Sequence, residues 1–317
     1  MFDNLAKVVI RESVVGLSFW MPKERRIRLE RWLRGREEFR RLQRADAVVV
    51  SYGKSGRTWL RVMLSRFYQV KHGIAEKHMI GFDNFHRMNP AAPKLLFTHD
   101  NYLKDYTGHG GDKRDYYDSR VVLMVRDPAD TAVSQYFQWK FRMRKGKKAL
   151  NKYPEHGSEV EIFDFVMDPD AGIPKIVDYM NAWATEIPRI REVLLIRYEE
   201  LRADTPGALR RVVDFLGTPG DDKEIGEAVS YASVENMRKL EEKGTFWRAG
   251  GRMKPGQKDN PNSFKVRRAK VGGYRDYFDD AQVAAIETYL RENLSPVFGY
   301  GLETPLAERQ PRQAANG

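Results

Sequence analysis

Four short apolar runs, each about the length of a buried strand, constrain the fold of this chain more than any other feature. They are rich in valine, isoleucine and leucine, and they lie at residues 47–52, 94–98, 121–125 and 193–197. The segments between them have the spacing of amphipathic helices, at residues 58–70, 130–142, 174–187 and 206–216. Strands that alternate with helices predict an α/β fold, in which a central parallel sheet is flanked by helices on both faces. Such sheets bind their ligands beyond the carboxyl ends of the strands.

The composition indicates a globular protein with anionic partners. Hydrophobic residues make up 41% of the 317 residues, which is enough for one large domain with a packed core. The 55 Lys and Arg outnumber the 44 Asp and Glu, and the net charge of +11 favours a phosphorylated ligand, nucleic acid or an acidic membrane face. The absence of cysteine excludes disulfides, thiolate zinc sites and cysteine nucleophiles.

Neither a membrane span nor a secretory signal is expected near the start of the chain. The longest uncharged stretch there, residues 13–22, is far shorter than the ~20 apolar residues that a spanning helix needs. A signal peptide would place its basic residues before the apolar run and a small-residue cleavage site after it, and neither feature stands out. We therefore expect a cytoplasmic protein.

The ends of the chain differ in character from its middle. Residues 1–44 read as a helical arm, in which residues 23–44 carry ten Lys and Arg against four Glu. Such an arm either docks on the core as a solvated helix or makes a peripheral contact with anionic lipid at the inner membrane face. We expect the main domain to cover residues 45–303 and the tail, residues 304–317, to be disordered. The basic segment 140–157 and the Gly-, Lys- and Pro-rich segment 244–262 read as flexible loops that cover a site.

The strongest local motif is the sequence VVVSYGKSGRTW at residues 48–59, in which a strand runs through a short turn into a helix that begins near Thr58. Helix starts present backbone N–H groups and a positive dipole end, and glycines allow the backbone to wrap closely round an anion. Lys54 adds a positive charge, and Ser55 and Thr58 add hydroxyls that bind an anion or cap the helix. The bland interpretation is a turn that uses glycine and serine for geometry alone. A Walker A loop is excluded, since Val48 stands where its first glycine is required.

The motif resembles a loop of the cytosolic-type sulfotransferases that depend on 3′-phosphoadenosine-5′-phosphosulfate (PAPS). Their loop reads PKSGTTW, and it binds the 5′-phosphosulfate of the donor. The resemblance implies that Lys54 stabilises charge on the oxygen that bridges sulfur and phosphorus and that Trp59 stacks on adenine. The residues that it assigns to donor binding are Lys54, Ser55, Gly56, Arg57, Thr58 and Trp59. Arg57 departs from the family pattern, which has threonine there.

A second strand–turn–helix motif covers residues 121–136. Arg126 follows the strand, and Ser134 lies on the second turn of the helix. An arginine fork and a hydroxyl on one side can clamp a phosphate. The alternative is an ordinary ion pair between Arg126 and Asp127 or Asp130. The spacing of Arg126 and Ser134 resembles the family motif for the 3′-phosphate of the donor, which ATP lacks.

A third resemblance lies near the other end, at residues 264–278. Arg267, Arg268, Gly272 and Phe278 match the family loop RKGxxGxWxxxF, whereas Ala269 replaces its first glycine. A basic glycine loop taken alone is usually solvated surface, so its value comes from the other two motifs. The resemblance implies that Arg267, Arg268 and Ala269 bind the 3′-phosphate. Tyr198 matches a tyrosine that contacts the adenine edge.

His99 is the candidate general base. It follows the apolar run at residues 94–98, so it is expected at the carboxyl end of a strand, and its side chain titrates near neutral pH. A lone histidine is more often structural. The run LLFTH resembles the family sequence KTH, whose histidine is the catalytic base, although Phe97 stands where many relatives have lysine. Arg57 offers partial compensation for that missing charge.

Together the motifs predict a P-loop-like sulfotransferase fold over residues 45–302. The implied reaction moves a sulfuryl group from PAPS to a hydroxyl or amine and releases PAP, without a metal. The expected acceptor is a small molecule, a saccharide or a glycolipid, and no nucleic acid is expected. Two other functions stay open: an ATP-dependent small-molecule kinase, and a catalytically silent basic scaffold for nucleic acid or lipid. The acceptor's identity and the oligomeric state are not predicted.

Overall fold

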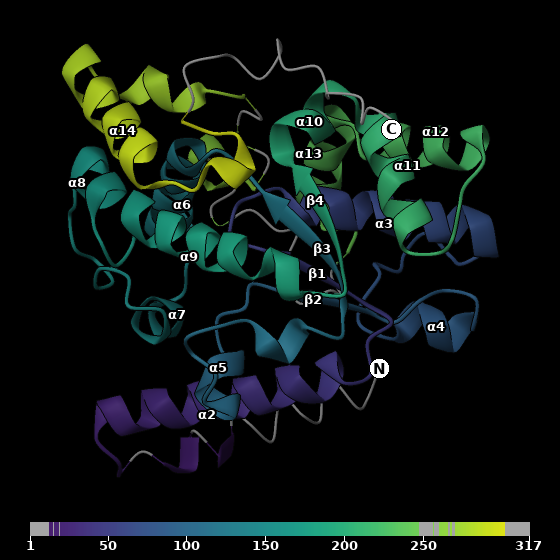
Figure 1. Cartoon of the computed structure of the whole chain (residues 1–317), viewed down its shortest axis with the longest axis horizontal. Coiled ribbons are helices and arrows are strands. Elements are labelled where there is room, and N and C mark those ends of the chain that lie inside the picture. Colours follow the sequence, from purple (N-terminus) through teal and green to yellow (C-terminus); the bar gives the residue numbers. More distant parts are fainter. Residues whose placement is uncertain are drawn as a thin grey trace, which may run out of the picture.

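A four-stranded parallel sheet forms the centre of the protein (Figure 1). The computed structural model describes residues 13–14, 16–18, 20–246, 256, 260–265, 267 and 270–301. The strands are β1 (Ala47–Ser51), β2 (Leu95–Thr98), β3 (Arg120–Val125) and β4 (Glu192–Arg197), in the order β2-β1-β3-β4. All three pairings are parallel, so the carboxyl ends of the strands meet at one edge. The predicted α/β fold and its four strands are confirmed.

Helices cover both faces of the sheet. Those that position the site are α3 (Arg57–His72), α6 (Pro128–Phe141), α9 (Ile173–Glu186), α10 (Tyr198–Ala203), α11 (Thr205–Phe215), α12 (Asp222–Tyr231), α13 (Val234–Lys243) and α14 (Asp280–Asn293). Four of them, α3, α6, α9 and α11, agree with the four predicted helical segments to within two residues at each end. Shorter helices are α4 (Asn84–Met88), α5 (Leu103–Thr107), α7 (Lys145–Leu150) and α8 (Ile162–Met167), and an N-terminal helix, α2, spans Lys23–Leu42.

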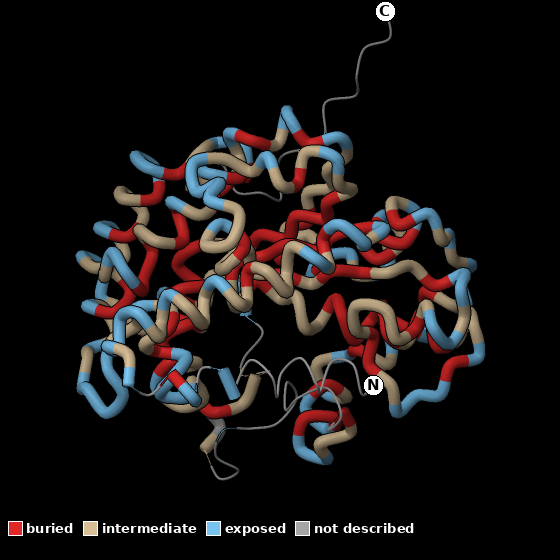
Figure 2. The backbone as a smooth tube through the Cα atoms, turned by 90° about the horizontal axis from the view of Figure 1, so that it is seen from below, coloured by how far each residue is buried: buried red, intermediate tan, exposed pale blue. Residues whose placement is uncertain are grey.

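Alternate residues along the strands divide the core into two layers. Val49 and Val122 pack with apolar side chains of α3, α11 and α12 on one face. Val48 and Val121 pack with side chains of α6, α9 and α14 on the other face. Successive side chains of a strand point to opposite faces, so a strand that is buried on both sides must be apolar throughout. Figure 2 shows the buried segments gathered in the middle of the molecule and exposed residues around the outside.

The segment 140–157 was expected to be a flexible loop, and this prediction is wrong for much of its length. Its first residues complete α6, and α7 occupies Lys145–Leu150. Leu150 is buried, and Lys148 is buried with its ammonium over the ring of Trp139, 4.6 Å from the ring centroid. The stem of a lysine can cover apolar surface, which a reading of charge alone overlooks. Most of the other predicted loop, residues 244–262, and the whole tail from residue 302 lie outside the described residues.

The N-terminal helix α2 docks on the core through α5, as the first of its two interpretations predicts (Figure 1). Arg31 pairs with Asp105 at 2.9 Å, and the ring of Tyr106 packs edge-on against Trp32 with centroids 5.3 Å apart. Gly35 is buried where the two helices approach most closely. A Cβ atom there would lie 2.2 Å from the carbonyl oxygen of Tyr102.

We predict that Gly35→Ala destabilises the protein by about 1–3 kcal/mol, since the added methyl group must push α2 away from α5. Thermal unfolding measures this as a lower Tm. The matched control is Gly226→Ala in α12, where nothing lies within 4 Å of the new Cβ. Because alanine favours a helix over glycine, this control should gain roughly 0.5–1 kcal/mol. Equal stabilisation of both variants would contradict the close contact at Gly35.

Candidate functional site

One large cavity opens above the carboxyl ends of the strands, and its volume of about 2240 Å³ is more than one ligand needs. Typical small-molecule pockets hold roughly 300–1,000 Å³, so this cavity has room for two ligands side by side. Nearly all of the sequence-predicted site residues that the structure describes line it. They are Lys54, Gly56, Arg57, Thr58, Trp59, His99, Arg126, Ser134, Tyr198 and Arg267.

The turn between β1 and α3, residues 52–56, which we call the phosphate loop, has the backbone conformation that an anion cradle requires. Lys54 has φ 73° and Gly56 has φ 90°, both in the left-handed region, so two nearly consecutive residues bend the chain sharply. A Cβ atom at Gly56 would meet the Tyr198 ring at 2.6 Å, and only glycine fits there. Gly56 is the N-cap of α3, and no side chain caps this helix. Neither Ser55 nor Thr58 acts as the cap, so the first N–H groups of α3 remain for a ligand.

Lys54 lies among other cations and has an unusual pKa. Its pKa is lowered to about 7, mainly because its ammonium group is shielded from water and next because Arg142 and Arg126 lie nearby. Glu241 acts in the opposite direction. A bound anion reverses this effect, since it favours the charged form of the lysine.

Arg126 lies between the phosphate loop and residues 264–278, which we call the C-terminal segment: it donates to the carbonyls of Lys54 and Lys270. Its guanidinium stacks on the ring of Tyr198, 4.4 Å from the centroid, and one of its nitrogens is 3.4 Å from a carboxylate oxygen of Asp130. The anticipated ion pair with Asp130 is thus present. That carboxylate also accepts hydrogen bonds from the backbone N–H groups of Gly272 and Tyr274, at 2.9 and 3.0 Å. Asp130 therefore fastens the C-terminal segment beside Arg126 as well as pairing with it.

The C-terminal segment is fixed at a second point. The buried carboxylate of Glu241 accepts a hydrogen bond from the backbone N–H of Lys265 at 2.8 Å. It also forms an ion pair with the guanidinium of Arg142, at 2.8 Å. Arg267 packs over the ring of Phe137, 3.9 Å from the centroid, and donates to the hydroxyl of Tyr277. The predicted residues Arg268 and Ala269 lie outside the described residues.

An aromatic pair lines the cavity near α10. Trp59 and Tyr198 meet edge to face with centroids 5.9 Å apart, and the Trp59 indole donates to the carbonyl of Ala232 at 2.7 Å. The guanidinium of Arg202 lies 5.6 Å from the Trp59 ring centroid. Arg202 also lines the cavity, and the sequence patterns gave no signal for it.

The tautomer of His99 follows from a single hydrogen bond. Its Nδ1 lies 2.8 Å from the backbone carbonyl oxygen of Ser51 at the end of β1. A carbonyl oxygen can only accept, so Nδ1 carries the hydrogen and Nε2 keeps the lone pair that can take a proton. Shielding from water lowers the pKa of His99 well below its usual value, and Arg57 lowers it further. The ring is therefore neutral near pH 7.

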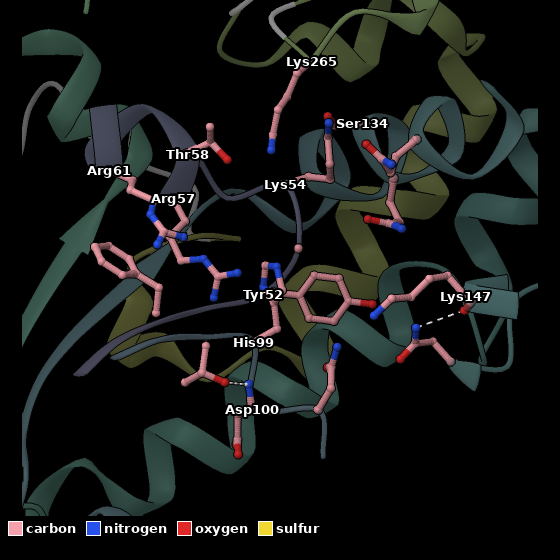
Figure 3. Close-up of a pocket in the computed structure, with 18 of the residues that line it drawn as sticks. Tyr52, Lys54, Arg57, Thr58, Arg61, His99, Asp100, Ser134, Lys147 and Lys265 are labelled. Carbon is pink, nitrogen blue, oxygen red and sulfur yellow. Dashed lines mark hydrogen bonds between the residues drawn. The ribbon is translucent and has the colours of Figure 1, made fainter. Parts of the chain in front are cut away.

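Figure 3 shows the side chain of Arg57 directed toward His99, although the sequence motif placed Arg57 with the donor loop. Phe97 packs under the guanidinium of Arg61, which lies 4.3 Å from the ring centroid. Arg61 in turn donates to the carbonyl of Ile80 at 2.6 Å. Two arginines of α3, Arg57 and Arg61, thus line the same part of the cavity as Phe97.

Glu38, on α2, lines the cavity next to the strand end that carries His99, and sequence reasoning missed it. Its carboxylate accepts a hydrogen bond from Thr98, the residue before His99. The pKa of Glu38 is raised to about 7, chiefly because the carboxyl group is shielded from water; the Thr98 hydrogen bond opposes that rise. No local motif predicts the position of Glu38 in the cavity, because that position depends on how α2 docks beside β2.

The cavity concentrates the positive charge of the protein. Of the described residues that line it, 20 are Lys or Arg and seven are Asp or Glu. Subtracting these from the totals of 55 and 44 leaves 35 basic and 37 acidic residues for the rest of the chain. The described lining of the cavity therefore carries an excess of 13 basic residues, more than the net charge of +11 of the whole chain. A scaffold for nucleic acid would instead spread its cations along an exposed groove.

Among the residues that the structure describes, no group of three or more His, Cys, Asp or Glu is arranged to hold a metal ion. Within the same residues, none of the helices combines the length and the apolar character that crossing a membrane requires.

The chain is similar to known proteins along most of its length. The family model for the sulfotransferase domain matches residues 116–298, more than half of the chain. Cytosolic sulfotransferase 3 of Arabidopsis thaliana is 24% identical over 271 residues, which cover 80% of this chain and 77% of that protein. Sulfotransferase 6B1 of Danio rerio is 23% identical over 269 residues, 79% of this chain and 78% of that protein.

Solved structures share the fold. The crystal structure of a mouse sulfotransferase complexed with PAP has a TM-score of 0.51 at 20% identity, and the match covers 78% of this chain and 84% of that one. Retinol dehydratase in a complex with retinol and PAP has a TM-score of 0.55 at 17% identity, covering 82% and 83%. The fold, the matched domain and the relatives agree with the motifs in the sequence: the chain belongs to the sulfotransferase family.

Proposed function

We propose that this enzyme transfers the sulfuryl group of PAPS to a hydroxyl or amine acceptor, with His99 as the general base. The observation that carries the proposal is the hydrogen bond from His99 Nδ1 to the Ser51 carbonyl, which leaves Nε2 as a proton acceptor in the cavity. His99 follows β2 and the phosphate loop follows β1, and these two strands are parallel neighbours. The base and the phosphate loop therefore share one edge of the sheet.

The reaction is an in-line transfer. The acceptor oxygen or nitrogen forms a bond to sulfur while its proton passes to His99 Nε2. The bond between sulfur and the bridging oxygen breaks, and its electron pair leaves with PAP. Lys54 in its charged form stabilises the negative charge on that oxygen, as positioned cations do in phosphoryl transfer. No step of this scheme calls for a metal.

The donor fits along the β1–β3–β4 side of the cavity. The first N–H groups of α3, with Ser55 and Thr58, bind the phosphosulfate. Arg126, Ser134 and Arg267, with Arg268 and Ala269 of the sequence motif, bind the 3′-phosphate. Trp59 and Tyr198 enclose the adenine between the two phosphate sites. A kinase would have no use for the second phosphate site, so the two-site arrangement favours PAPS over ATP.

We also propose the domain boundaries, which rest on the extent of the sequence motifs and on the basic arm before them. We assign the catalytic domain to residues 45–303, the arm to residues 1–44 and the tail to residues 304–317. The acceptor is a small molecule, and a saccharide or glycolipid falls within the proposal because hydroxyl-bearing side chains line the acceptor side of the cavity.

The first test is His99→Ala. Loss of a positioned base should lower kcat by about 10²–10⁴ while leaving the affinity for PAP nearly unchanged. Release of labelled sulfate ester measures the first quantity and calorimetry the second. His86→Ala is the matched control, since His86 also bonds a backbone carbonyl, that of Ala92, but lies outside the cavity. Near-normal turnover by His99→Ala would remove His99 as the base.

A second test uses the pKa of Lys54. Free Lys54, with a pKa of about 7, is mostly neutral at about pH 8, and the phosphosulfate site of bound PAP should raise that pKa. Binding of PAP at about pH 8 should therefore take up a fraction of a proton, and affinity should fall as the pH rises through this range. Calorimetry in two buffers of different ionisation enthalpy measures the uptake. The phosphates of PAP, with a second pKa near about 6, are already ionised there.

Lys54→Arg is the control for this measurement, because arginine stays charged at every relevant pH. The variant should bind PAP with much less proton uptake than the natural protein. Identical uptake by both proteins would show that another group is responsible.

We also propose that the arm contacts anionic membranes at the cytoplasmic face. Trp20 and Leu17 are 75% and 72% exposed, and exposed Lys23, Arg25 and Arg28 follow them at the start of α2. Exposed aromatic and apolar side chains beside cations are typical of interfacial segments.

The arm proposal predicts that the protein sediments with vesicles that contain phosphatidylserine and not with pure phosphatidylcholine vesicles. Trp20→Ala should reduce the bound fraction several-fold. Equal binding of Trp20→Ala and the natural protein would reject the arm as the membrane contact.

A further inference from the structure

The acceptor side of the cavity carries its own group of cations, apart from those assigned to the donor. Three of them surround the ring of Tyr102. Arg31, Arg34 and Lys147 lie 5.3, 5.6 and 5.5 Å from its centroid, and Lys147 also donates to the Tyr102 hydroxyl at 3.4 Å. They come from α2 and α7, which lie far from the donor motifs in sequence, and all three line the cavity.

Two further lysines lie on the same side. Lys175, on α9, donates to the carbonyl of Asn151, a residue whose side chain accepts a hydrogen bond from the Tyr102 hydroxyl at 3.1 Å. Lys175 and Lys152 both line the cavity. The pKa of Lys175 is lowered to about 8, mainly because its ammonium group is shielded from water, and Lys152 and Arg31 lower it further. We call Arg31, Arg34, Lys147, Lys152 and Lys175 the Tyr102 cluster.

Acidic residues on this side balance only part of the charge of the Tyr102 cluster. Asp105 is held by Arg31 at 2.9 Å, and Glu30 by Arg34 at 2.5 Å. Asp170 accepts a hydrogen bond from Lys175 through its backbone carbonyl, and its carboxylate opposes the lowering of the pKa of Lys175. Like charges gathered along one side of a cavity repel one another, and an anion that binds there relieves this repulsion.

The donor does not supply that anion. PAPS brings about four negative charges, with about −1.5 to −2 on its 3′-phosphate. These charges meet Lys54, Arg126, Arg267 and the start of α3 on the other side of the cavity. The Tyr102 cluster accounts for five of the 20 Lys and Arg that line the cavity, and none of these five is assigned to the donor.

The cluster also lies within reach of the reacting centre. Lys147 is one of the cations that lower the pKa of His99, so its charge is felt at the base. Figure 3 shows Lys147 and His99 on either side of Tyr52, around one opening. An acceptor of modest size can therefore place a hydroxyl at His99 and a charged group at the Tyr102 cluster.

We propose that the acceptor is itself an anion: a hydroxyl compound that carries a phosphate, sulfate or carboxylate group, which the Tyr102 cluster binds. This inference rests on the proposed sulfuryl transfer and names its substrate class. It assigns the N-terminal helix α2 a part in acceptor recognition, through Arg31 and Arg34.

The test compares matched acceptors on the protein saturated with PAP. Glucose 6-phosphate is compared with glucose, and 4-hydroxybenzoate with 4-hydroxybenzamide, by calorimetry, and then as acceptors with PAPS. At least one anionic member should bind about tenfold or more tightly than its neutral partner, and the difference should shrink as salt is added. If neither anion binds more tightly than its neutral partner, the proposal is overturned.

Variants locate the effect. Lys147→Gln should weaken binding of the preferred anion by roughly three- to tenfold and leave the neutral partner and PAP unaffected. Lys145→Gln is the matched control, since Lys145 is exposed on the same helix but does not line the cavity. If Lys147→Gln and Lys145→Gln lose affinity for the anion equally, the effect is long-range electrostatic attraction to the protein, and the assignment of the site is overturned. Failure of PAP to bind at all would instead reject the proposed function, so the two failures are distinguishable.

Discussion

The parallel pairing of β2, β1 and β3 is the constraint on which the rest of this structure depends. It brings the residues that follow three separate strands to one edge of the sheet: His99 after β2, the phosphate loop after β1 and Arg126 after β3. The hydrogen bond from His99 to the Ser51 carbonyl then joins the first two of these ends directly. Because the strands are buried on both faces, their register is fixed by core packing, and the site inherits that rigidity.

Gathering cations in a site that is shielded from water costs free energy. Burial, and next the nearby arginines, hold the pKa of Lys54 at about 7, and burial and Arg57 keep His99 neutral, so the cavity limits its own charge. The left-handed backbone of Lys54 adds local strain, which ordinary residues avoid. Buried carboxylates on neighbouring elements offset part of this cost: Asp130 fastens the segment at Gly272 and Tyr274, and Glu241 fastens the segment at Lys265.

The N-terminal helix α2 and the residues before it link the proposed anionic acceptor to the proposed membrane contact. Three arginines of α2 line the cavity, so part of its basic character faces the site and not the solvent. The exposed residues that precede it are those that suit a membrane surface. An arm that binds both an anionic acceptor and an anionic membrane would bring the enzyme to substrates at that membrane surface.

The sequence alone determined the fold class, the four strands and the motifs after three of them, since apolar runs, helical spacing and glycine positions are local properties of the chain. It also led to the family, through residues that lie within about ten positions of one another in each motif. The tertiary structure alone decided the rest. Arg57 turns toward His99, Glu38 reaches Thr98 from the arm, and Tyr102 gathers cations from two helices. These contacts join segments 40 or more residues apart, and no local pattern encodes them, because they depend on how the helices pack around the sheet.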